Sequence, residues 1–207
     1  MTRYRYAVVE TTAPDPMEHR VTWAQLAEDD CRDRWCEMVA PFLYVPVDDD
    51  LVGQAARLRT SAEDPYTATL AANEFVHRNV SYRSGSTTVA TSAPDAFRVG
   101  EGVCQDFAHI MLALLRAMGI PGRYVSGYLY PAAAGLNEVH AGQSHAWVEA
   151  WLGDWLALDP THGGFLGPQP VVVARGRDYA DVAPMKGIFT GGPLQTLEVE
   201  VHLTRVA

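Results

Sequence analysis

The sequence has few cysteines and no long apolar run, and no secretory signal peptide is visible in it. Three cysteines, Cys31, Cys36 and Cys104, are too few for a disulfide framework, and an odd number cannot all form pairs within the chain. No second Cys or His pair of zinc-ligand spacing follows the first two, which disfavours a structural zinc. No stretch of about 18 apolar residues is present, and no basic segment precedes an apolar one at the start. We therefore expect a cytoplasmic protein without a membrane span.

Basic residues are in deficit. The 207 residues include 16 Lys and Arg against 25 Asp and Glu, a net charge of −9. Nucleic acid and anionic membranes are disfavoured as partners, because like charges repel. Hydrophobic residues make up 48% and charged residues 20% of the chain, as in a folded globular domain. The length predicts one domain, alone or with a small appendage, and does not indicate an oligomeric state.

Familiar cofactor motifs are missing as well. The sequence contains no G-x-S-x-G elbow, phosphate loop or dinucleotide fingerprint. It has no calcium loop of the usual acidic spacing, and His109 and His140 lack partners at metal-ligand spacing. We therefore expect no cofactor and no metal.

Residues 1–50 differ from the rest of the chain. A strand is predicted over Tyr4–Val9, and two prolines interrupt the segment after it. Acidic runs at 28–30 and 48–50 are typical of solvated surface or linker. The segment has too few periodic elements for a core of its own. We expect it to pack as an appendage on a main body that spans residues 51–207.

Two helices are predicted in the main body. The first opens at Pro65, a favoured first helical residue, and runs through Val76. Residues 81–95 are rich in Ser, Thr, Gly and Pro and predict a loop. The second helix starts at Cys104, just after two glycines, and stops at Gly119. Apolar residues recur along one face of it at spacings of 3, 4 and 7.

Strands follow the second helix. Alternating patterns predict strands over 123–130, 144–152 and 155–159, with a loop over 131–142 and a turn at 153–154. A last strand is predicted from the alternation of Leu197, Val199, Val201 and Leu203. A helix followed by an antiparallel sheet that packs on it is an α+β domain.

The predicted position of Cys104 at a helix N-terminus favours a role as a nucleophile. Its partial positive charge and free N–H groups stabilise an anion, and a thiol placed there ionises more readily and becomes a better nucleophile. The backbone N–H groups also face the position of an oxyanion during acyl transfer. A buried structural cysteine is the alternative.

His145 and Asp159 strengthen the nucleophile hypothesis. They lie at opposite or nearly opposite positions of the predicted hairpin, where a carboxylate would hold the imidazole in one tautomer. A core histidine and an aspartate that merely forms a turn are the alternatives. Together with Cys104, the two residues form a coherent set of nucleophile, base and orienting group.

Three segments resemble the signature blocks of the transglutaminase-like superfamily: Gly102–His109, Ser144–Glu149 and Leu158–Thr161. The match is closest to bacterial transglutaminase-like cysteine peptidases, and Gly176–Pro184 also resembles that group. The resemblance implies a papain-like fold, with Cys104 as nucleophile, His145 as general base and Asp159 as its orienting residue. It covers about residues 51–207. Residues 1–50 resemble only the tail of the β-rich domain that such proteins carry, either in a natural short form or because the start was placed downstream.

Other residues are weaker candidates. Gln105 could help to hold an oxyanion and Asp106 could support it, although both could be ordinary exposed residues of a first helical turn. Asp178 and Tyr179 could line a substrate site or only anchor a late loop. Trp147 could support the site, and with Trp151 and Trp155 it could form a substrate wall. Aromatic packing within the sheet is the favoured interpretation of the three tryptophans.

These residues predict catalysis through a thioester of Cys104. Water as acceptor gives a peptidase or amidase, and an amine gives a transglutaminase or amide synthase. Hydrolysis of a peptide or isopeptide bond is favoured, because an amine route requires a binding cleft that the sequence does not display. The expected partner is a peptide or protein amide, with an amine as possible co-substrate. An acyltransferase acting on a carrier-bound thioester and a catalytically silent binding module are the rival functions.

Overall fold

The computed structural model describes residues 6–11, 20–130, 135–166, 170–183 and 200–206. Its helices are α1 (Trp23–Leu26), α2 (Asp29–Arg34), α3 (Cys36–Val39), α4 (Asp49–Thr60), α5 (Pro65–Asn79), α6 (Ala93–Val99), α7 (Cys104–Ala117) and α8 (Tyr179–Val182). Its strands are β1 (Ser81–Tyr82), β2 (Glu101–Gly102), β3 (Gly122–Leu129), β4 (Val139–Ala141), β5 (Ser144–Trp151), β6 (Trp155–Leu158), β7 (Pro170–Gly176) and β8 (His202–Thr204). Within these ranges no helix combines the length and the apolar character that a membrane crossing requires.

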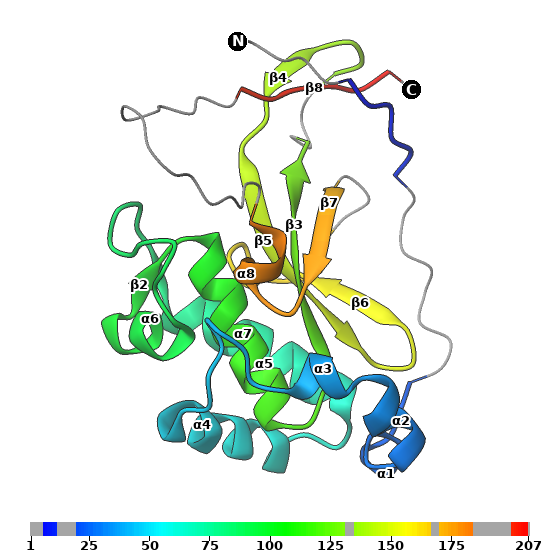
Figure 1. Ribbon diagram of the computed structural model, residues 1–207, viewed down its shortest axis with the longest axis vertical. Helices are drawn as coiled ribbons and strands as arrows, with labels where there is room; N and C mark the ends of the chain where they lie inside the picture. Colours follow the sequence, from blue (N-terminus) through cyan, green and yellow to red (C-terminus); the bar gives the residue numbers. More distant parts are fainter. Residues whose placement is uncertain (1–5, 12–19, 131–134, 167–169, 184–199, 207) are drawn as a thin grey trace, which may run out of the picture.

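Helix α7 lies at the centre of the molecule, between helices α4, α5 and α6 and the sheet (Figure 1). All of its residues from Gln105 to Arg116 are buried. The predicted apolar face is therefore only part of its buried surface, because the opposite face packs on helices instead of facing water. This complete burial brings polar Gln105, Asp106 and His109 into the interior, where each needs a hydrogen-bond partner.

The main sheet has four antiparallel strands in the order β6-β5-β3-β7. The alternation predicted for 144–152 is confirmed. Ala146, Val148 and Ala150 belong to the core that includes α7, whereas Trp147 packs with Val125 and others in a second cluster. The α+β prediction, a helix beginning with the candidate nucleophile and packed on an antiparallel sheet, is thus confirmed.

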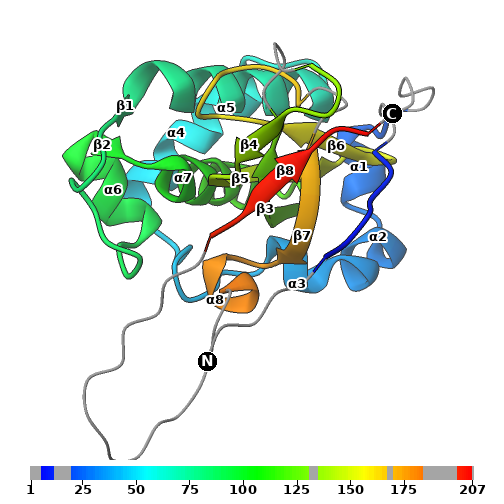
Figure 2. The ribbon, with the colours of Figure 1, turned by 90° about the horizontal axis from the view of Figure 1, so that it is seen from above.

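Gly127 shows how tightly β3 is packed between its neighbours. A Cβ atom there would lie 2.2 Å from the carbonyl oxygen of Val171 and 2.5 Å from the ring of Trp147. The register of β3 and β7 also shifts at this point. Only glycine fits, because any side chain would displace backbone on β7. β4 and β8 pair as a separate ribbon beyond the end of the sheet (Figure 1), and in the view from above they lie over its strands (Figure 2).

Local signals correctly placed both predicted helices. Asp64 caps α5 by accepting the N–H of Thr67 at 2.7 Å, and Pro65 is its first residue. Helix α7 begins at Cys104, and Gly119 follows its end with a φ of 80°, a backbone conformation that favours glycine.

Several expectations were wrong. Residues 81–95 contain β1 and the start of α6, which Ser92 caps, and 131–142 contain β4. Strand β7 was not predicted. Strand β6 ends at Leu158, one residue before Asp159. The last strand is confined to β8, while Leu197 and Val199 lie outside the described residues.

The N-terminal segment also differs from expectation. Residues 6–11 form no strand, and Tyr6 and Val8 are exposed. Strand-forming residues alone do not make a strand, because the segment also needs a partner strand to pair with. The acidic runs start helices α2 and α4, where carboxylates compensate the helix dipole, so they are not linkers. Their residues are exposed except for half-buried Asp48, which confirms the alternative of a solvated surface. The proposed domain boundary at residue 50 stays a prediction.

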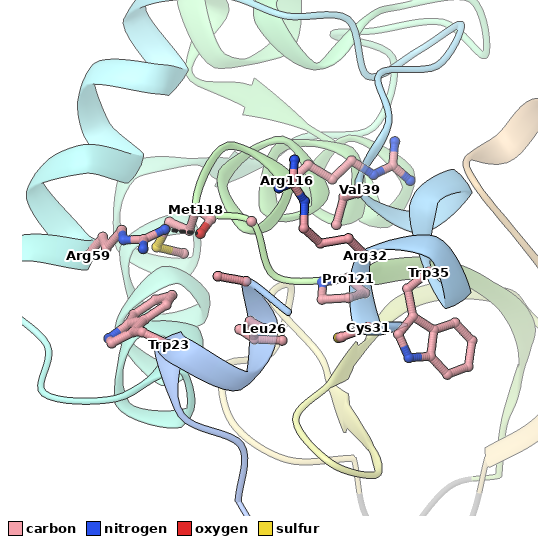
Figure 3. A pocket seen from close by; sticks show the side chains of 12 residues that line it. Trp23, Leu26, Cys31, Arg32, Trp35, Val39, Arg59, Arg116, Met118 and Pro121 are labelled. Carbon is pink, nitrogen blue, oxygen red and sulfur yellow. Dashed lines mark hydrogen bonds between the residues drawn. The ribbon is translucent and has the colours of Figure 1, made fainter. Parts of the chain in front are cut away.

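Helix α3 contacts α7, and residues of α1, α2 and α3 that line a cavity lie around the C-terminal end of α7, opposite to the end that carries Cys104. The cavity has a volume of about 360 Å³ (Figure 3). Its lining includes Trp23, Cys31, Trp35 and Met118. Trp35 also contacts the rings of Trp151 and Trp155, at centroid distances of 5.6 and 5.0 Å. These two sheet tryptophans therefore serve packing, as favoured from the sequence.

Candidate active site

The turn before α7 places Cys104 at the helix N-terminus, half-buried. Asp106, 1% exposed, accepts the backbone N–H of Val103 at 2.8 Å and the hydroxyl of Thr87 at 2.6 Å. Burial raises the pKa of Asp106, and these two hydrogen bonds oppose that rise. Asp106 therefore braces the turn that carries the candidate nucleophile.

Gln105 braces the same turn from another side. Its amide nitrogen donates to the carbonyl of Val89 at 3.1 Å, so the loop between β1 and α6 is held against the start of α7. The alternative that Gln105 and Asp106 are ordinary exposed residues is wrong, because both are buried. In this arrangement the Gln105 amide binds protein backbone, and a role for it in holding an oxyanion stays a prediction.

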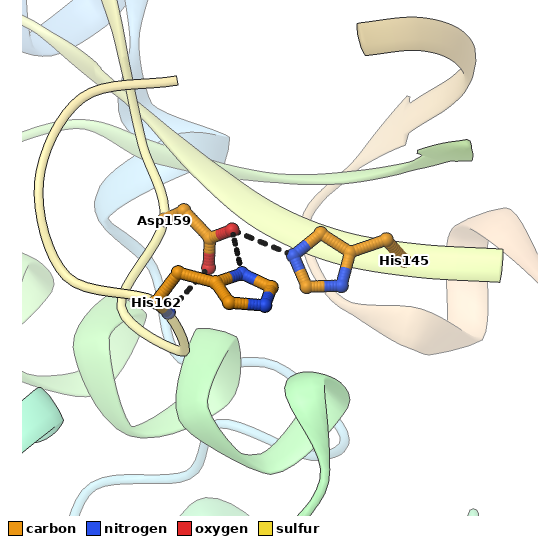
Figure 4. A group of neighbouring side chains, drawn as sticks. All are labelled: His145, Asp159 and His162. Atoms are coloured by element: carbon orange, nitrogen blue, oxygen red, sulfur yellow. Dashed lines mark hydrogen bonds and ion pairs between the residues drawn. The ribbon is translucent and has the colours of Figure 1, made fainter. Parts of the chain in front are cut away.

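His145 and Asp159 meet as the hairpin predicts. Nε2 of His145 lies 2.7 Å from Oδ2 of Asp159, and the two side chains are only 10% and 6% exposed (Figure 4). Burial lowers the pKa of His145, but hydrogen bonds and negative charge from Asp159 and Cys104 outweigh it and raise the pKa to about 9. The structure thus brings Cys104, His145 and Asp159 together, with Nε2 of the imidazole bonded to the carboxylate.

A tight turn after β6 holds the carboxylate of Asp159. Its Oδ1 accepts the backbone N–H groups of Thr161 at 2.9 Å and of His162 at 3.3 Å. Burial raises the pKa of Asp159, but the hydrogen bonds and charges of His145 and His162 outweigh it and lower the pKa to about 2. Asp159 is therefore an anion at neutral pH, as an orienting residue requires.

His162 was missed from the sequence. Its Nδ1 lies 2.8 Å from Oδ2 of Asp159, and its ring centroid is 5.1 Å from that of His145 (Figure 4). The signal was its position three residues after an aspartate in a turn, because the residues that follow an aspartate in a turn commonly hydrogen-bond to its carboxylate. His145, Asp159 and His162 place possible ligand atoms within 4.8 Å of one another, as a metal site would. The same atoms are already joined by hydrogen bonds that account for their approach.

Two aromatic residues stand beside the site. Trp147 is fully buried, and its ring lies roughly parallel to that of His145 at a centroid distance of 6.4 Å. It thus supports the imidazole and offers no exposed substrate wall. Tyr124 was not a candidate from the sequence. Burial raises the pKa of Tyr124 well above its ordinary value, and the charge of Cys104 adds to that rise.

Asp178 and Tyr179 hold the late segment in place. Asp178 is fully buried and accepts the N–H groups of Tyr44 at 2.7 Å and of Ala180 at 2.8 Å, which caps α8. The backbone N–H of Tyr179 donates to Nε2 of His109 at 3.2 Å. Burial lowers the pKa of His109 to about 3, and the charge of Arg116 adds to this, so His109 is a neutral acceptor. These contacts favour the anchoring role over a substrate-binding one.

Comparison with known proteins identifies the family. Residues 53–160, which contain Cys104, His145 and Asp159, match the transglutaminase-like superfamily. An uncharacterized protein of Mycobacterium leprae is 43% identical over 202 residues, 97% of this chain and 72% of that protein. A protein-glutamine gamma-glutamyltransferase of Pseudomonas aeruginosa is 32% identical over 163 residues, 71% of this chain but 24% of that protein.

A solved structure agrees with this relation. The "Putative Cysteine Protease" of Cytophaga hutchinsonii superposes with a TM-score of 0.62 at 36% identity, covering 72% of this chain and 49% of that one. The chain therefore spans about half or less of two of these three proteins. The family match spans more than half of the chain, the architecture agrees with it, and the chain belongs to the transglutaminase-like superfamily.

Proposed function

We propose that this chain catalyses acyl transfer from a peptide or protein carboxamide through a thioester of Cys104. The observation that carries the proposal is the pairing of a thiol at a helix N-terminus with an imidazole whose Nε2 is bonded to a buried carboxylate at 2.7 Å. In this arrangement Nδ1 of His145 remains for the thiol, and Asp159 stabilises the imidazolium.

In the first half-reaction, the sulfur of Cys104 attacks the carbonyl carbon while His145 holds the thiol proton. The C–N bond then breaks, and the imidazolium gives its proton to the leaving amine or ammonia. Backbone N–H groups at the start of α7 are placed to stabilise the oxyanion of the tetrahedral intermediate.

In the second half-reaction, an acceptor attacks the thioester carbonyl, loses a proton and releases the thiolate of Cys104. Water as acceptor makes the enzyme a peptidase or amidase, and an amine makes it a transglutaminase. We propose hydrolysis, because water is abundant and because the structural neighbour at 36% identity is named a cysteine protease. Amine transfer is the second candidate, favoured by the relative named a protein-glutamine gamma-glutamyltransferase.

A glutamine-containing dipeptide tests both candidates at once. Release of ammonia or of free amino acids without amine incorporation supports hydrolysis, and incorporation of an added primary amine supports transamidation. Cys104→Ala should abolish both while leaving the far-ultraviolet circular dichroism unchanged. Turnover of a carrier-bound thioester but of no peptide would favour the acyltransferase. A wild-type chain in which no substrate acylates Cys104 would favour the binding module.

A further inference from the structure

One carboxylate oxygen in the site serves two imidazoles. Oδ2 of Asp159 lies 2.7 Å from Nε2 of His145 and 2.8 Å from Nδ1 of His162 (Figure 4). A carboxylate only accepts hydrogen bonds, so both ring nitrogens must be N–H donors. The two rings are consequently held in opposite tautomers when neutral. His145 keeps its Nδ1 free of a proton, and His162 keeps its Nε2 free.

The two imidazoles differ in what they can reach. The side chain of His145 is 10% exposed and interacts with Cys104. The side chain of His162 is 67% exposed, and its Nε2 points away from Asp159 (Figure 4). A ring held through Nδ1–H by a carboxylate, with Nε2 open, is the arrangement of a general base. Unlike His145, this base is open to an acceptor that arrives from solvent.

The turn that carries His162 is fixed from outside. His77 on α5 lies with its Nδ1 3.1 Å from the carbonyl oxygen of Thr161. Gly163 has a φ of 75°, and a Cβ atom there would lie 2.9 Å from the ring of His77. The backbone N–H of Gly163 donates to the carbonyl of Asp159 at 2.9 Å. The position of His162 is thus set by the fold, although its side chain is exposed.

We propose that His162 is a second general base, oriented by the same carboxylate as His145, which takes the proton of the acyl acceptor. The inference rests on the proposed function and assigns a residue to its second half-reaction. As the acceptor oxygen or nitrogen bonds to the thioester carbon, its proton passes to Nε2 of His162. The C–S bond then breaks, the thiolate of Cys104 is released, and the imidazolium of His162 later loses the proton to solvent. His145 serves the thiol and the leaving group, and His162 serves the acceptor.

A chromogenic ester separates the two half-reactions. With p-nitrophenyl acetate, the burst of p-nitrophenol reports acetylation of Cys104, and the later linear phase reports hydrolysis of the acetyl thioester. The informative variant is His162→Asn, because the amide nitrogen of Asn occupies the place of Nδ1 and can still donate to Asp159 but offers no base. We expect the burst to change less than about twofold and the linear phase to slow about 100-fold, the low end for a positioned general base.

Two further measurements sharpen the result. Imidazole added to His162→Gly should restore part of the linear phase, because the free base occupies the vacated space. His140→Asn is the matched control, since His140 also lies within 3.3 Å of a carboxylate, that of Glu138, but on the separate β4–β8 ribbon. Neither phase should change in it.

Each outcome decides the question. An unchanged linear phase in His162→Asn overturns the proposal. Equal loss of burst and linear phase also overturns it, because His162 would then act only by positioning Asp159 and His145. A wild-type chain with no burst at Cys104, checked by mass spectrometry, overturns the proposed function and the assignment of His162 with it.

Discussion

Replacing Asp159 by Asn removes the charge that keeps the imidazole of His145 protonated. In the native chain the pKa of His145 is raised from 6.5 to about 9, against a burial effect that would lower it. That rise corresponds to about 3 kcal/mol of preference for the imidazolium. With Asn at 159, only Cys104 still opposes the effect of burial, and the pKa of His145 should fall well below its native value of about 9.

The assay is a pH titration of the histidine ring protons by heteronuclear NMR between pH 5 and 10. His145→Gln assigns the resonance, and the half-buried His140 provides an internal comparison. A His145 resonance that titrates at the same pH in the native chain and in Asp159→Asn would contradict this explanation. The carboxylate 2.7 Å away would then have no effect on the pKa of His145.

The same pKa shift predicts how stability depends on pH. A group with a raised pKa in the folded state stabilises the fold fully below its unfolded pKa, here about 6.5, and the effect is lost as pH rises through about 9. The difference in unfolding free energy between the native chain and His145→Gln should therefore shrink between pH 6.5 and 9. Urea denaturation across this range measures it, and a difference that stays constant would contradict the assignment.

Three substitutions test the packing of the fold around the site and away from it. Gly102→Ala would bring a Cβ atom within 2.6 Å of the Asp106 side chain, so it should lower the free energy of unfolding by about 1–3 kcal/mol. Gly53→Ala in α4 meets nothing within 4 Å and should instead raise it by about 0.5–1 kcal/mol, which urea denaturation can compare. Glu149→Ala would leave Arg123 and Arg175 without the carboxylate that lies 2.5 and 2.9 Å from them, and should cost about 3 kcal/mol. A thermal midpoint equal to that of the native chain would show that these ion pairs do not stabilise the sheet.

Much of the site could be predicted because its signals are local. The glycines before Cys104 and the apolar spacing after it predict a helix that starts there, and the alternation around Trp147 predicts a strand. A hairpin then brings His145 close to Asp159 without any knowledge of the rest of the fold. The bond at 2.7 Å is a consequence of this short-range geometry.

The features that could not be predicted depend on contacts between distant segments. The burial of Gln105 and Asp106 follows from the loop that carries Thr87 and Val89, which only the folded chain brings to α7. Two other elements were missed although their signals are local. Ser92 followed by Asp95 is a capping signal for helix α6, and the run of valines in β7 is a strand signal. Only the position of β7 beside β3 depends on the folded chain.

The three cysteines provide the most direct test of whether Cys104 is an activated nucleophile. Cys36 is exposed, Cys104 is half-buried, and burial followed by the charge of Glu28 raises the pKa of Cys31. If exposure alone governed reactivity, Cys36 would react first with iodoacetamide. We predict instead, by site-resolved mass spectrometry at about pH 7, near the operating pH of a catalytic base, that Cys104 reacts first and Cys31 last, and that His145→Ala slows Cys104 alone. A Cys104 that reacts more slowly than Cys36, or at the same rate in His145→Ala, would contradict the proposed mechanism.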